Sequence, residues 1–508
     1  MKENDMKPRK TFILLEVLII ALVSAIPLTS TASEESPAGQ LQITKEANSG
    51  QKVRSVTLQE SIEIALNKNR TRPMSQFAVE ISEAQLQQAL SSYWPQAALR
   101  SSYSYMNKRP DFLFPASTVN TPASTVIANT PLGPLPINVP AQSTNVPQQD
   151  VKLLDKTTLM TTLNVTYPLY TGGQRSAVVK QARSGLEAAK QEARRTDLQV
   201  IYDVKRMYYG AVLARELYRI GSEALQRMDV TLELTEKLYK TGSGRVKKTD
   251  YLRNKSVVEG LRSAVSYLKA NEDITLAALT NTMGLDWDTQ VQVSESDIPF
   301  NPYRGNLAAL VSNAYSFNPD WAKMQEGLNA AEAHIDEAKS GYFPKVAFIG
   351  NLENIQNAYD MGIVTPNNKN SWNVGIALEL PLFSGFRTKG EIREAVARLG
   401  QLSDEKVLLR EGIALQIKYI FTLMISAQEQ QRSAGEAAKA AEENRDLNER
   451  AYQEDLVETK DVIEAQLVES FLRAQYQKTL YDHIETQAHL DYVVGKEVQT
   501  LLWGKDKE

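Results

Sequence analysis

The sequence predicts a mostly α-helical fold with a transmembrane β-barrel component, in which one half-repeat of two strands and a long coiled-coil helical hairpin occurs twice. Three observations predict this fold. Identical residues recur at fixed separations between the two halves of the chain. Each half contains a proline-free stretch of about 67 residues with helical periodicity, and each half has two segments in which polar and apolar residues alternate.

The internal repeat is visible residue by residue. Near the start of each half, Tyr93 and Pro95 match Tyr342 and Pro344 at a separation of 249 positions. The separation falls to 213 for three further pairs: Pro168 and Pro381, Gly172 and Gly385, and Tyr239 and Tyr452. It becomes 211 for Asp250 with Asp461 and for Gly284 with Gly495. Separations that stay constant inside elements and change only across loops indicate a duplicated architecture.

The composition agrees with long helices and excludes several classes of site. Hydrophobic residues make up 42% of the 508 residues, and the mean hydropathy is −0.35. The net charge of −4 gives no reason to expect a nucleic-acid partner. Cysteine is absent, which excludes disulfides, thiolate metal sites and a lipid anchor on an N-terminal cysteine.

Residues 1–33 are expected to be a signal peptide. Lys7, Arg9 and Lys10 precede an apolar run over 11–28, and small residues follow at 30–33. An uncleaved membrane anchor is the alternative. Residues 34–54 are polar and are expected to be flexible, and no later stretch is apolar for about 18 residues, as a membrane-spanning helix requires.

The first repeat is expected over residues 55–284. Thr57 and Glu60 form a capping box before a helix that reaches about Ser92, with a break at Pro73. Strands are expected over 97–106 and 157–169, on either side of a Pro/Ser/Thr-rich stretch, 107–150, that predicts a long loop because its composition cannot build a core. A helix of about 100 Å over 175–241 and a return helix over 248–283 then form an antiparallel hairpin with a coiled-coil seam.

A linker over 285–305 leads to the second repeat, 306–495, and a tail over 496–508 follows it. The second repeat is expected to contain the same elements in the same order: a helix over 307–340 around Pro319, strands over 345–352 and 372–380, a long helix over 388–454, a turn at 455–459 and a return helix to 494.

The strands predict both a membrane and an oligomer. Each is about ten residues long, which suits a tilted strand crossing a bilayer. Four strands cannot close a barrel, and open sheet edges do not occur in lipid, so further copies of the chain have to complete it. Tyr93, Trp94, Tyr167 and Trp372 suit the aromatic girdles at the two interfaces. A small soluble sheet capped by helices is the alternative.

The strand-to-helix junctions carry a family resemblance. Residues 167–173 (YPLYTGG) and 380–386 (LPLFSGF) resemble the junctions of the TolC-like outer-membrane efflux proteins, whose glycine and proline positions are here Pro168, Gly172, Gly173, Pro381 and Gly385. Thr249–Leu252 and Asp461–Gln466, with Tyr452, are similar to the two hairpin tips of that family. The resemblance covers about residues 55–496. Three features depart from the family pattern: the long 107–150 stretch, two extra residues and basic side chains at the first tip, and the missing lipidated cysteine.

The resemblance implies a location, an assembly and partners. The chain would be a homotrimeric α/β-barrel tunnel in outer-membrane lipid, with helices extending into the periplasm. It would act as a passive conduit of a tripartite efflux or type I secretion system, coupled to an inner-membrane transporter through a periplasmic adaptor protein. The alternative function is a periplasmic coiled-coil adaptor or a structural envelope protein.

Acidic residues at the second tip are candidates for a pore constriction. Asp461 and Glu464 lie three residues apart and share a helix face. Similar acidic positions in the family line the periplasmic entrance and favour cations, so three copies would bring six carboxylates together, assisted by Asp250. The alternative is that these are ordinary surface carboxylates near a turn.

The tips themselves are candidate docking points for the adaptor, with plain solvated turns as the alternative. The residues concerned are Gly242, Ser243, Gly244, Arg245, Val246 and Lys247 in the first tip and Asp455, Leu456 and Val457 in the second.

No enzymatic function or cofactor is expected. The basic stretch 242–249 lacks the glycine and lysine spacing of a phosphate loop and lies between helices, not after a strand. The three histidines are His334, His483 and His489. His483 and His489 are six residues apart and do not share a helix face well, so metal ligation is not expected.

Overall fold

The structure is a computed structural model that describes residues 54–153, 155–242, 246–357, 364–365, 367–454 and 456–496. The predicted signal peptide, the segment to residue 53 and the tail from residue 497 lie outside these ranges. The described chain forms two compact units. We call 54–84, 183–330 and 399–496 the hairpin unit, and 85–182 with 331–398 the sheet unit. Among the described residues, no helix combines the length and apolar character needed to cross a membrane.

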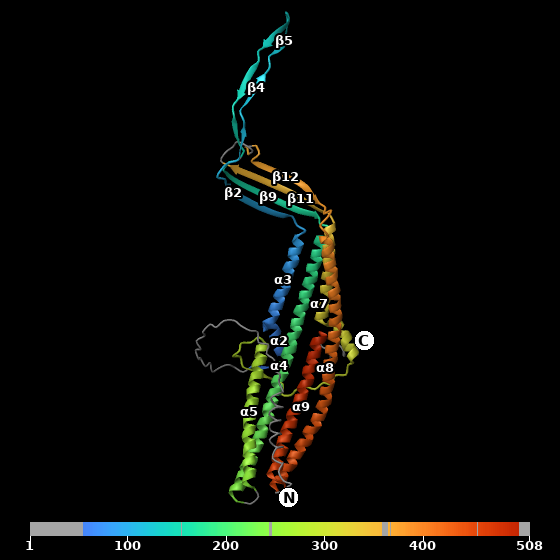
Figure 1. Ribbon diagram of the computed structural model, residues 1–508. Coiled ribbons are helices and arrows are strands. Elements are labelled where there is room, and N and C mark those ends of the chain that lie inside the picture. The colour runs from blue at the N-terminus through green and yellow to red at the C-terminus, as the bar shows by residue number, and fades with distance from the viewer. Residues whose placement is uncertain are drawn as a thin grey trace, which may run out of the picture. The chain divides into compact units, whose positions relative to one another are not determined.

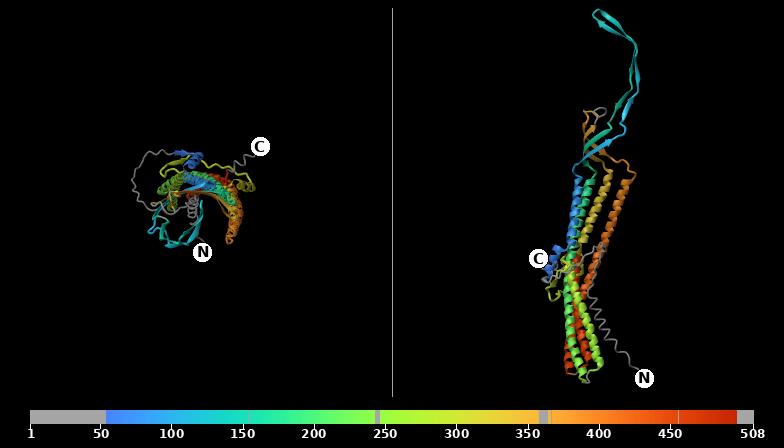
Figure 2. Two further views of the ribbon diagram at one scale, coloured as in Figure 1. Left: turned by 90° about the horizontal axis from the view of Figure 1, so that it is seen from above. Right: turned by 90° about the vertical axis from the view of Figure 1, so that its left-hand side faces the viewer.

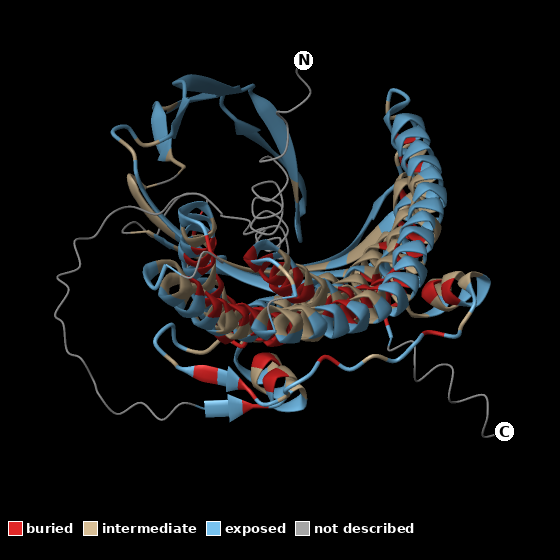
Figure 3. Ribbon diagram, turned by 90° about the horizontal axis from the view of Figure 1, so that it is seen from below, coloured by how far each residue is buried: buried red, intermediate tan, exposed pale blue. Residues whose placement is uncertain are grey.

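The predicted helical hairpins are present. α4 (Gln174–Lys240) and α8 (Arg387–Gln453) each have 67 residues, and α5 (Lys248–Thr282) and α9 (Thr459–Val494) return alongside them (Figures 1 and 2). In the second hairpin, Ile417, Ile420 and Met424 of α8 have no exposed surface, as the seam of a coiled coil requires. The prediction of a mostly helical fold is therefore confirmed. Figure 3 shows buried residues gathered where helices face one another.

The shorter helices are each interrupted at an asparagine. Each predicted helix is divided in two: α2 (Leu58–Lys68) and α3 (Thr71–Ser91), and α6 (Leu307–Phe317) and α7 (Pro319–Lys339). The first break falls at residues 69–70, just before the position expected at Pro73, which lies inside α3. Asn69 accepts a hydrogen bond from the Thr71 amide at 2.9 Å and donates to the Thr282 carbonyl at 2.8 Å. In the second repeat, Asn318 accepts from the Trp321 amide and donates to the Val493 carbonyl. Each asparagine thus caps one helix and binds the end of a return helix.

A glycine completes each of these contacts. Gly284 and Gly495 follow α5 and α9 with φ of +70° and +85°. A Cβ at Gly284 would lie 2.5 Å from the Lys68 carbonyl oxygen, and one at Gly495 would lie 2.3 Å from that of Phe317. Only glycine permits both the left-handed conformation and this close approach.

Two short strands in the hairpin unit were missed by the sequence prediction. β1 (Arg54–Val56) begins in the segment expected to be flexible and pairs in parallel with β10 (Val291–Val293) in the linker. Val56 is fully buried, and its carbonyl accepts a hydrogen bond from the Tyr208 hydroxyl of α4 at 3.1 Å. Three-residue strands carry too few residues to show a period, which explains the omission.

The sheet unit contains a four-stranded antiparallel sheet with the order β12-β11-β9-β2. Its strands are β2 (Gln96–Tyr105), β9 (Thr157–Tyr170), β11 (Lys345–Asn357) and β12 (Asn370–Glu379). All four were predicted, although β11 extends five residues beyond its expected end at Leu352. The extension is polar except for Ile355 and pairs with the start of β9. Alternation of apolar residues alone could not indicate it.

The prediction of a loop over 107–150 is wrong. The stretch is a two-stranded ribbon of three consecutive antiparallel pairs, which Figure 1 shows at β4 and β5. The pairs are β3 (Asp111–Phe114) with β8 (Gln149–Lys152), β4 (Ser117–Thr121) with β7 (Gln142–Val146), and β5 (Ser124–Thr130) with β6 (Gly133–Val139). The loop prediction assumed that strands need a core, whereas ladder hydrogen bonds alone define this ribbon. We call residues 111–152 the ribbon.

Candidate functional site

The sheet has one apolar and one polar face. Pairing places Leu99, Leu163, Leu352 and Trp372 side by side across all four strands. The row beside it contains Ala98, Asn164, Asn351 and Asn373, and the Asn351 amide donates to the Asn373 side chain at 2.9 Å. Because side chains alternate between the faces of a strand, these two rows lie on opposite faces.

Further rows continue the same division. The apolar face adds Tyr167, Phe348 and Ile376 in one row, whereas the polar face adds Thr162, Glu353 and Ser371. Leu99 and Trp372 are each 71% exposed, so the apolar face is open within one chain. The edge strands β2 and β12 are each paired on one side only.

The predicted junction residues form tight turns between the strands and the long helices. Pro168 lies in β9 beside a bulge in the pairing with β11, and Pro381 follows β12. Gly172, Gly173 and Gly385 have φ of +65°, +90° and +61°. A Cβ at Gly172 would lie 2.6 Å from that of Phe343. In the second repeat, Phe386 takes the place of the second glycine and also has a positive φ, +66°.

The two hairpin tips share a cleft of about 580 Å³ in the hairpin unit. Of the predicted tip residues, Val246, Lys247, Leu456 and Val457 line it, together with Asp250 and Asp461. Gly242 lies in the turn after α4 and has a φ of +66°. Ser243, Gly244, Arg245 and Asp455 lie outside the described residues, and Glu464 is exposed on α9 without lining the cleft. The structure thus brings together the two aspartates that the repeat had paired.

Both aspartates also cap helices. The Asp250 carboxylate accepts a hydrogen bond from the Lys247 amide at 3.0 Å at the start of α5. The Asp461 carboxylate accepts one from the Glu458 amide at 3.1 Å at the start of α9. A carboxylate in the first turn of a helix also interacts favourably with the helix dipole. A substitution at either aspartate would therefore change the tip structure as well as the charge.

Near the cleft, a polar network joins the four helices of the two hairpins, α4, α5, α8 and α9. The Tyr452 hydroxyl of α8 lies 3.0 Å from the Thr459 hydroxyl of α9 and 3.4 Å from the Thr235 hydroxyl of α4. Asn254 of α5 is fully buried and donates to the same Thr235 hydroxyl at 3.2 Å. Sequence analysis missed the network because threonine and asparagine in a helix give no signal of what faces them.

A second cluster lies further along these helices, around Glu469 of α9. Its carboxylate has no exposed surface and accepts hydrogen bonds from Arg227 of α4 at 2.9 Å, Arg445 of α8 at 2.9 Å and Arg473 of α9 at 3.1 Å. Arg473 also contacts Glu223 of α4 at 3.0 Å. The cluster joins the first hairpin to the second and was also missed.

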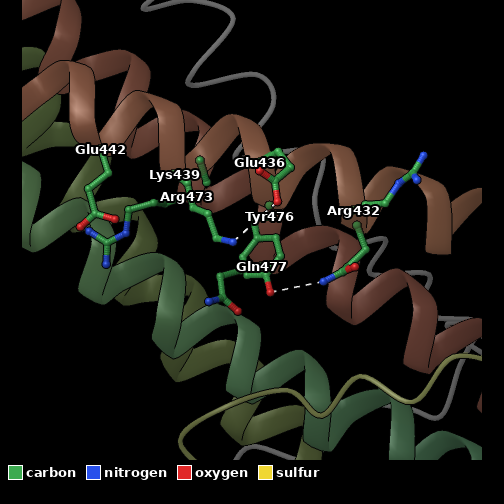
Figure 4. A pocket seen from close by; sticks show the side chains of 10 residues that line it. Arg432, Glu436, Lys439, Glu442, Arg473, Tyr476 and Gln477 are labelled. Atoms are coloured by element: carbon green, nitrogen blue, oxygen red, sulfur yellow. Dashed lines mark hydrogen bonds and ion pairs between the residues drawn. The ribbon is translucent and has the colours of Figure 1, made fainter.

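Between α8 and α9 lies a groove of about 400 Å³, shown in Figure 4. Charged side chains of α8, among them Arg432, Glu436 and Lys439, stand along one side. On the other side, Tyr476 of α9 accepts a hydrogen bond from Gln431 at 3.3 Å and lies 3.3 Å from where a Cβ of Gly435 would be. Arg473 of the ion cluster also lines the groove.

A duplicated unit of two strands and a long helical hairpin, with a two-faced sheet at the strands, defines a class of outer-membrane channel. The sequence profile of the family described as "Outer membrane efflux protein" matches residues 141–285 and 310–496, more than half of the chain. The chain therefore belongs to the outer membrane efflux protein family, a family of channels and not of enzymes. The predicted resemblance and the predicted outer-membrane location are confirmed, in preference to a periplasmic adaptor or structural protein.

Individual relatives are more distant. The pyoverdine export outer membrane protein OpmQ of Pseudomonas aeruginosa is 26% identical over 242 residues, which cover 47% of this chain and 49% of OpmQ. The chain spans about half the length of the curated relatives that it matches in this way.

Solved structures of outer-membrane proteins share the fold. The CmeC outer membrane channel of Campylobacter jejuni matches with a TM-score of 0.68 and 15% identity over 94% of this chain and 98% of CmeC. The outer membrane protein VceC of Vibrio cholerae matches with a TM-score of 0.66 and 18% identity over 86% of this chain and 96% of VceC.

Proposed function

We propose that three copies of this chain form one outer-membrane efflux channel, with the four strands of each copy contributing to a single β-barrel. The sheet carries this proposal. Its apolar face is largely open, its other face is polar, and its edge strands β2 and β12 are unpaired on their outer sides. Lipid tolerates no open sheet edge, so β2 of one copy would pair with β12 of the next, and the polar face would line the lumen.

The conduit would be passive and would work with an inner-membrane transporter through a periplasmic adaptor. The helical hairpins would continue the lumen into the periplasm, and the tip residues Val246, Lys247 and Leu456 would contact the adaptor. The groove between α8 and α9 offers a charged surface for a partner helix further along the second hairpin. If Lys247→Glu leaves capture of the adaptor unchanged, the assigned docking residues are incorrect.

The test of the channel is the state and conductance of the purified protein. A trimer that resists SDS and dissociates on heating, recovered from outer-membrane fractions and conducting in planar bilayers, is the expected result. A monomer that is freely soluble and shows no association with envelope fractions would contradict the proposal.

We also propose that the acidic tip residues make the entrance selective for cations. Three copies would bring Asp461, Glu464 and Asp250 near one axis, where carboxylates attract cations. Glu464→Gln is the better test, because Glu464 is exposed and removing its charge leaves both helix caps intact. The reversal potential in a salt gradient should shift toward weaker cation preference, and an unchanged reversal potential in both Glu464→Gln and Asp461→Asn would contradict the assignment.

A further inference from the structure

The ribbon is an unusual surface because it carries no charge along nearly its whole length. Residues 112–149 contain no Asp, Glu, Lys or Arg, although these residues make up 23% of the chain. The large apolar residues among them are exposed, with Val126 at 54%, Leu135 at 58% and Ile137 at 48%. Natural proteins usually protect isolated strands from association with charged side chains, especially lysine. The ribbon lacks this protection.

The end of the ribbon has two distinct faces. The register of β5 and β6 sets Val126 opposite Ile137 and Ala128 opposite Leu135, so these four side chains share one face. Thr125 and Asn138 stand opposite each other on the other face, where the threonine hydroxyl donates to the asparagine side chain at 2.8 Å. One face is therefore apolar and without a partner in the described chain, whereas the other is mixed, since beside the Thr125–Asn138 pair it carries Ile127, 65% exposed, opposite Pro136.

A ribbon of this kind is not expected to be stable alone. Each of its three strand pairs is a separate two-stranded sheet, and a two-stranded hairpin in water is marginally stable unless something packs on it. Addition of a further strand to β6 is disfavoured because Pro134 and Pro136 lack an amide hydrogen. Packing through the apolar face offers a means of stabilisation that depends on neither strand edge.

We propose that the apolar face of the ribbon packs against the ribbons of the other two copies in the trimer. The inference rests on the proposed trimeric channel. The ribbon joins β2 to β9, and β2 is the edge at which the next copy would pair, so the three ribbons leave the barrel from the same rim. Identical surfaces brought together around an axis repel if they carry charge, and the uncharged composition removes this repulsion. Six strands packed in this way form a collar that continues the channel outward.

Two adjacent residues provide a matched test. Val126 and Thr125 are both β-branched and lie next to each other on opposite faces of β5. The natural chain contains no cysteine, so Val126→Cys and Thr125→Cys each introduce a single thiol. In intact trimers, a short bismaleimide should link Val126→Cys subunits covalently and leave Thr125→Cys subunits unlinked. Val126→Lys should lower the temperature at which SDS-resistant trimers dissociate by several degrees, and Thr125→Lys should not.

The outcomes separate this inference from the proposed channel. If trimers form and conduct but Val126→Cys is not linked and reacts with a bulky maleimide as fast as Thr125→Cys, the ribbons do not pack together. If Val126→Cys is protected in cells, unlinked, and reactive in purified trimers, another molecule covers the face and the inference is equally wrong. If no trimer forms at all, the proposed channel fails first.

Discussion

Glu469 offers the most direct test of how the two hairpins are held together. Its carboxylate is fully buried and accepts hydrogen bonds from three arginines, one of which, Arg227, belongs to the first hairpin. The proposed perturbation is Glu469→Gln, which removes the charge but keeps the size and one acceptor oxygen. Removing one partner of a buried ion pair costs about 3–5 kcal/mol because the opposite charge stays buried.

The structure places the expected loss at the lower end of that range. Arg473 keeps Glu223 at 3.0 Å and Arg445 keeps Asp446 at 2.6 Å after the substitution. Arg227 is 25% exposed and has no second carboxylate among the described ion pairs. Because only Arg227 loses its carboxylate partner, and water can partly reach it, we expect a loss of about 3 kcal/mol in the free energy of unfolding.

The assay is thermal or denaturant unfolding of the purified protein, followed by circular dichroism. Glu464→Gln is the matched control, because Glu464 is an exposed glutamate of the same helix, and it should unfold within about 0.5 kcal/mol of the natural chain. The double variant Glu469→Gln/Arg227→Met should lose less than the sum of the single losses. A Glu469→Gln variant as stable as the control, or strictly additive losses, would show that the contact between hairpins does not depend on this charge.

Three further predictions concern the glycine that follows α5, the pH dependence of stability and the sheet. Gly284→Ala should lower the free energy of unfolding by at least about 1–2 kcal/mol, since its φ is +70° and the new Cβ would overlap a backbone carbonyl, whereas Gly327→Ala, at a helical glycine with open space, should be neutral or stabilising. Burial lowers the pKa of His483, so the unfolded chain binds a proton at higher pH than the folded chain does. The contribution of His483 to the free energy of unfolding is then fully present above about pH 6.5 and is lost as the pH falls below that value. Between about pH 7.5 and about pH 5, the free energy of unfolding should therefore fall less in His483→Gln than in the natural chain. Val374→Lys places a charge on the apolar face of β12, which costs about 2–4 kcal/mol in the bilayer and should reduce the yield of heat-modifiable trimer. The neighbouring Asn373→Lys, on the polar face, should assemble normally and change conductance.

The main elements could be predicted from the sequence because their signals are local and repeated. The proline-free stretches, the capping box at Thr57 and the glycines at 172 and 385 each have a physical meaning that needs no partner. The repeat added a second, independent observation for each of the four sheet strands and for the helices of the two hairpins. It also paired Asp250 with Asp461, which the structure then places in one cleft.

The rest depends on contacts that the sequence does not encode locally. The ribbon was missed because a stretch rich in proline and threonine is typical of loops, and only its register shows the strands. Asn69 and Asn318 bind carbonyls more than 170 residues away, at Thr282 and Val493. Arg227 and Glu469 are separated by 242 residues, and charged residues on a helix normally indicate a solvated face.

The repeat also shows where the packing of the two hairpins differs. The constant separation of 211 between α5 and α9 sets Glu469 against Val258, which is fully buried in an apolar cluster that α4 and α5 share with Ile463 and Leu467 of α9. Arg227, at the separation of 213 between α4 and α8, corresponds to Ala440. The first hairpin therefore packs at the equivalent position without charge, so the fold of a single hairpin does not require the ion cluster. Since a buried ion cluster is weak evidence for stability, the role that distinguishes Glu469 is its bond across to the first hairpin. Any movement that separates the two hairpins has to break this contact, whereas a movement of both hairpins together leaves it intact.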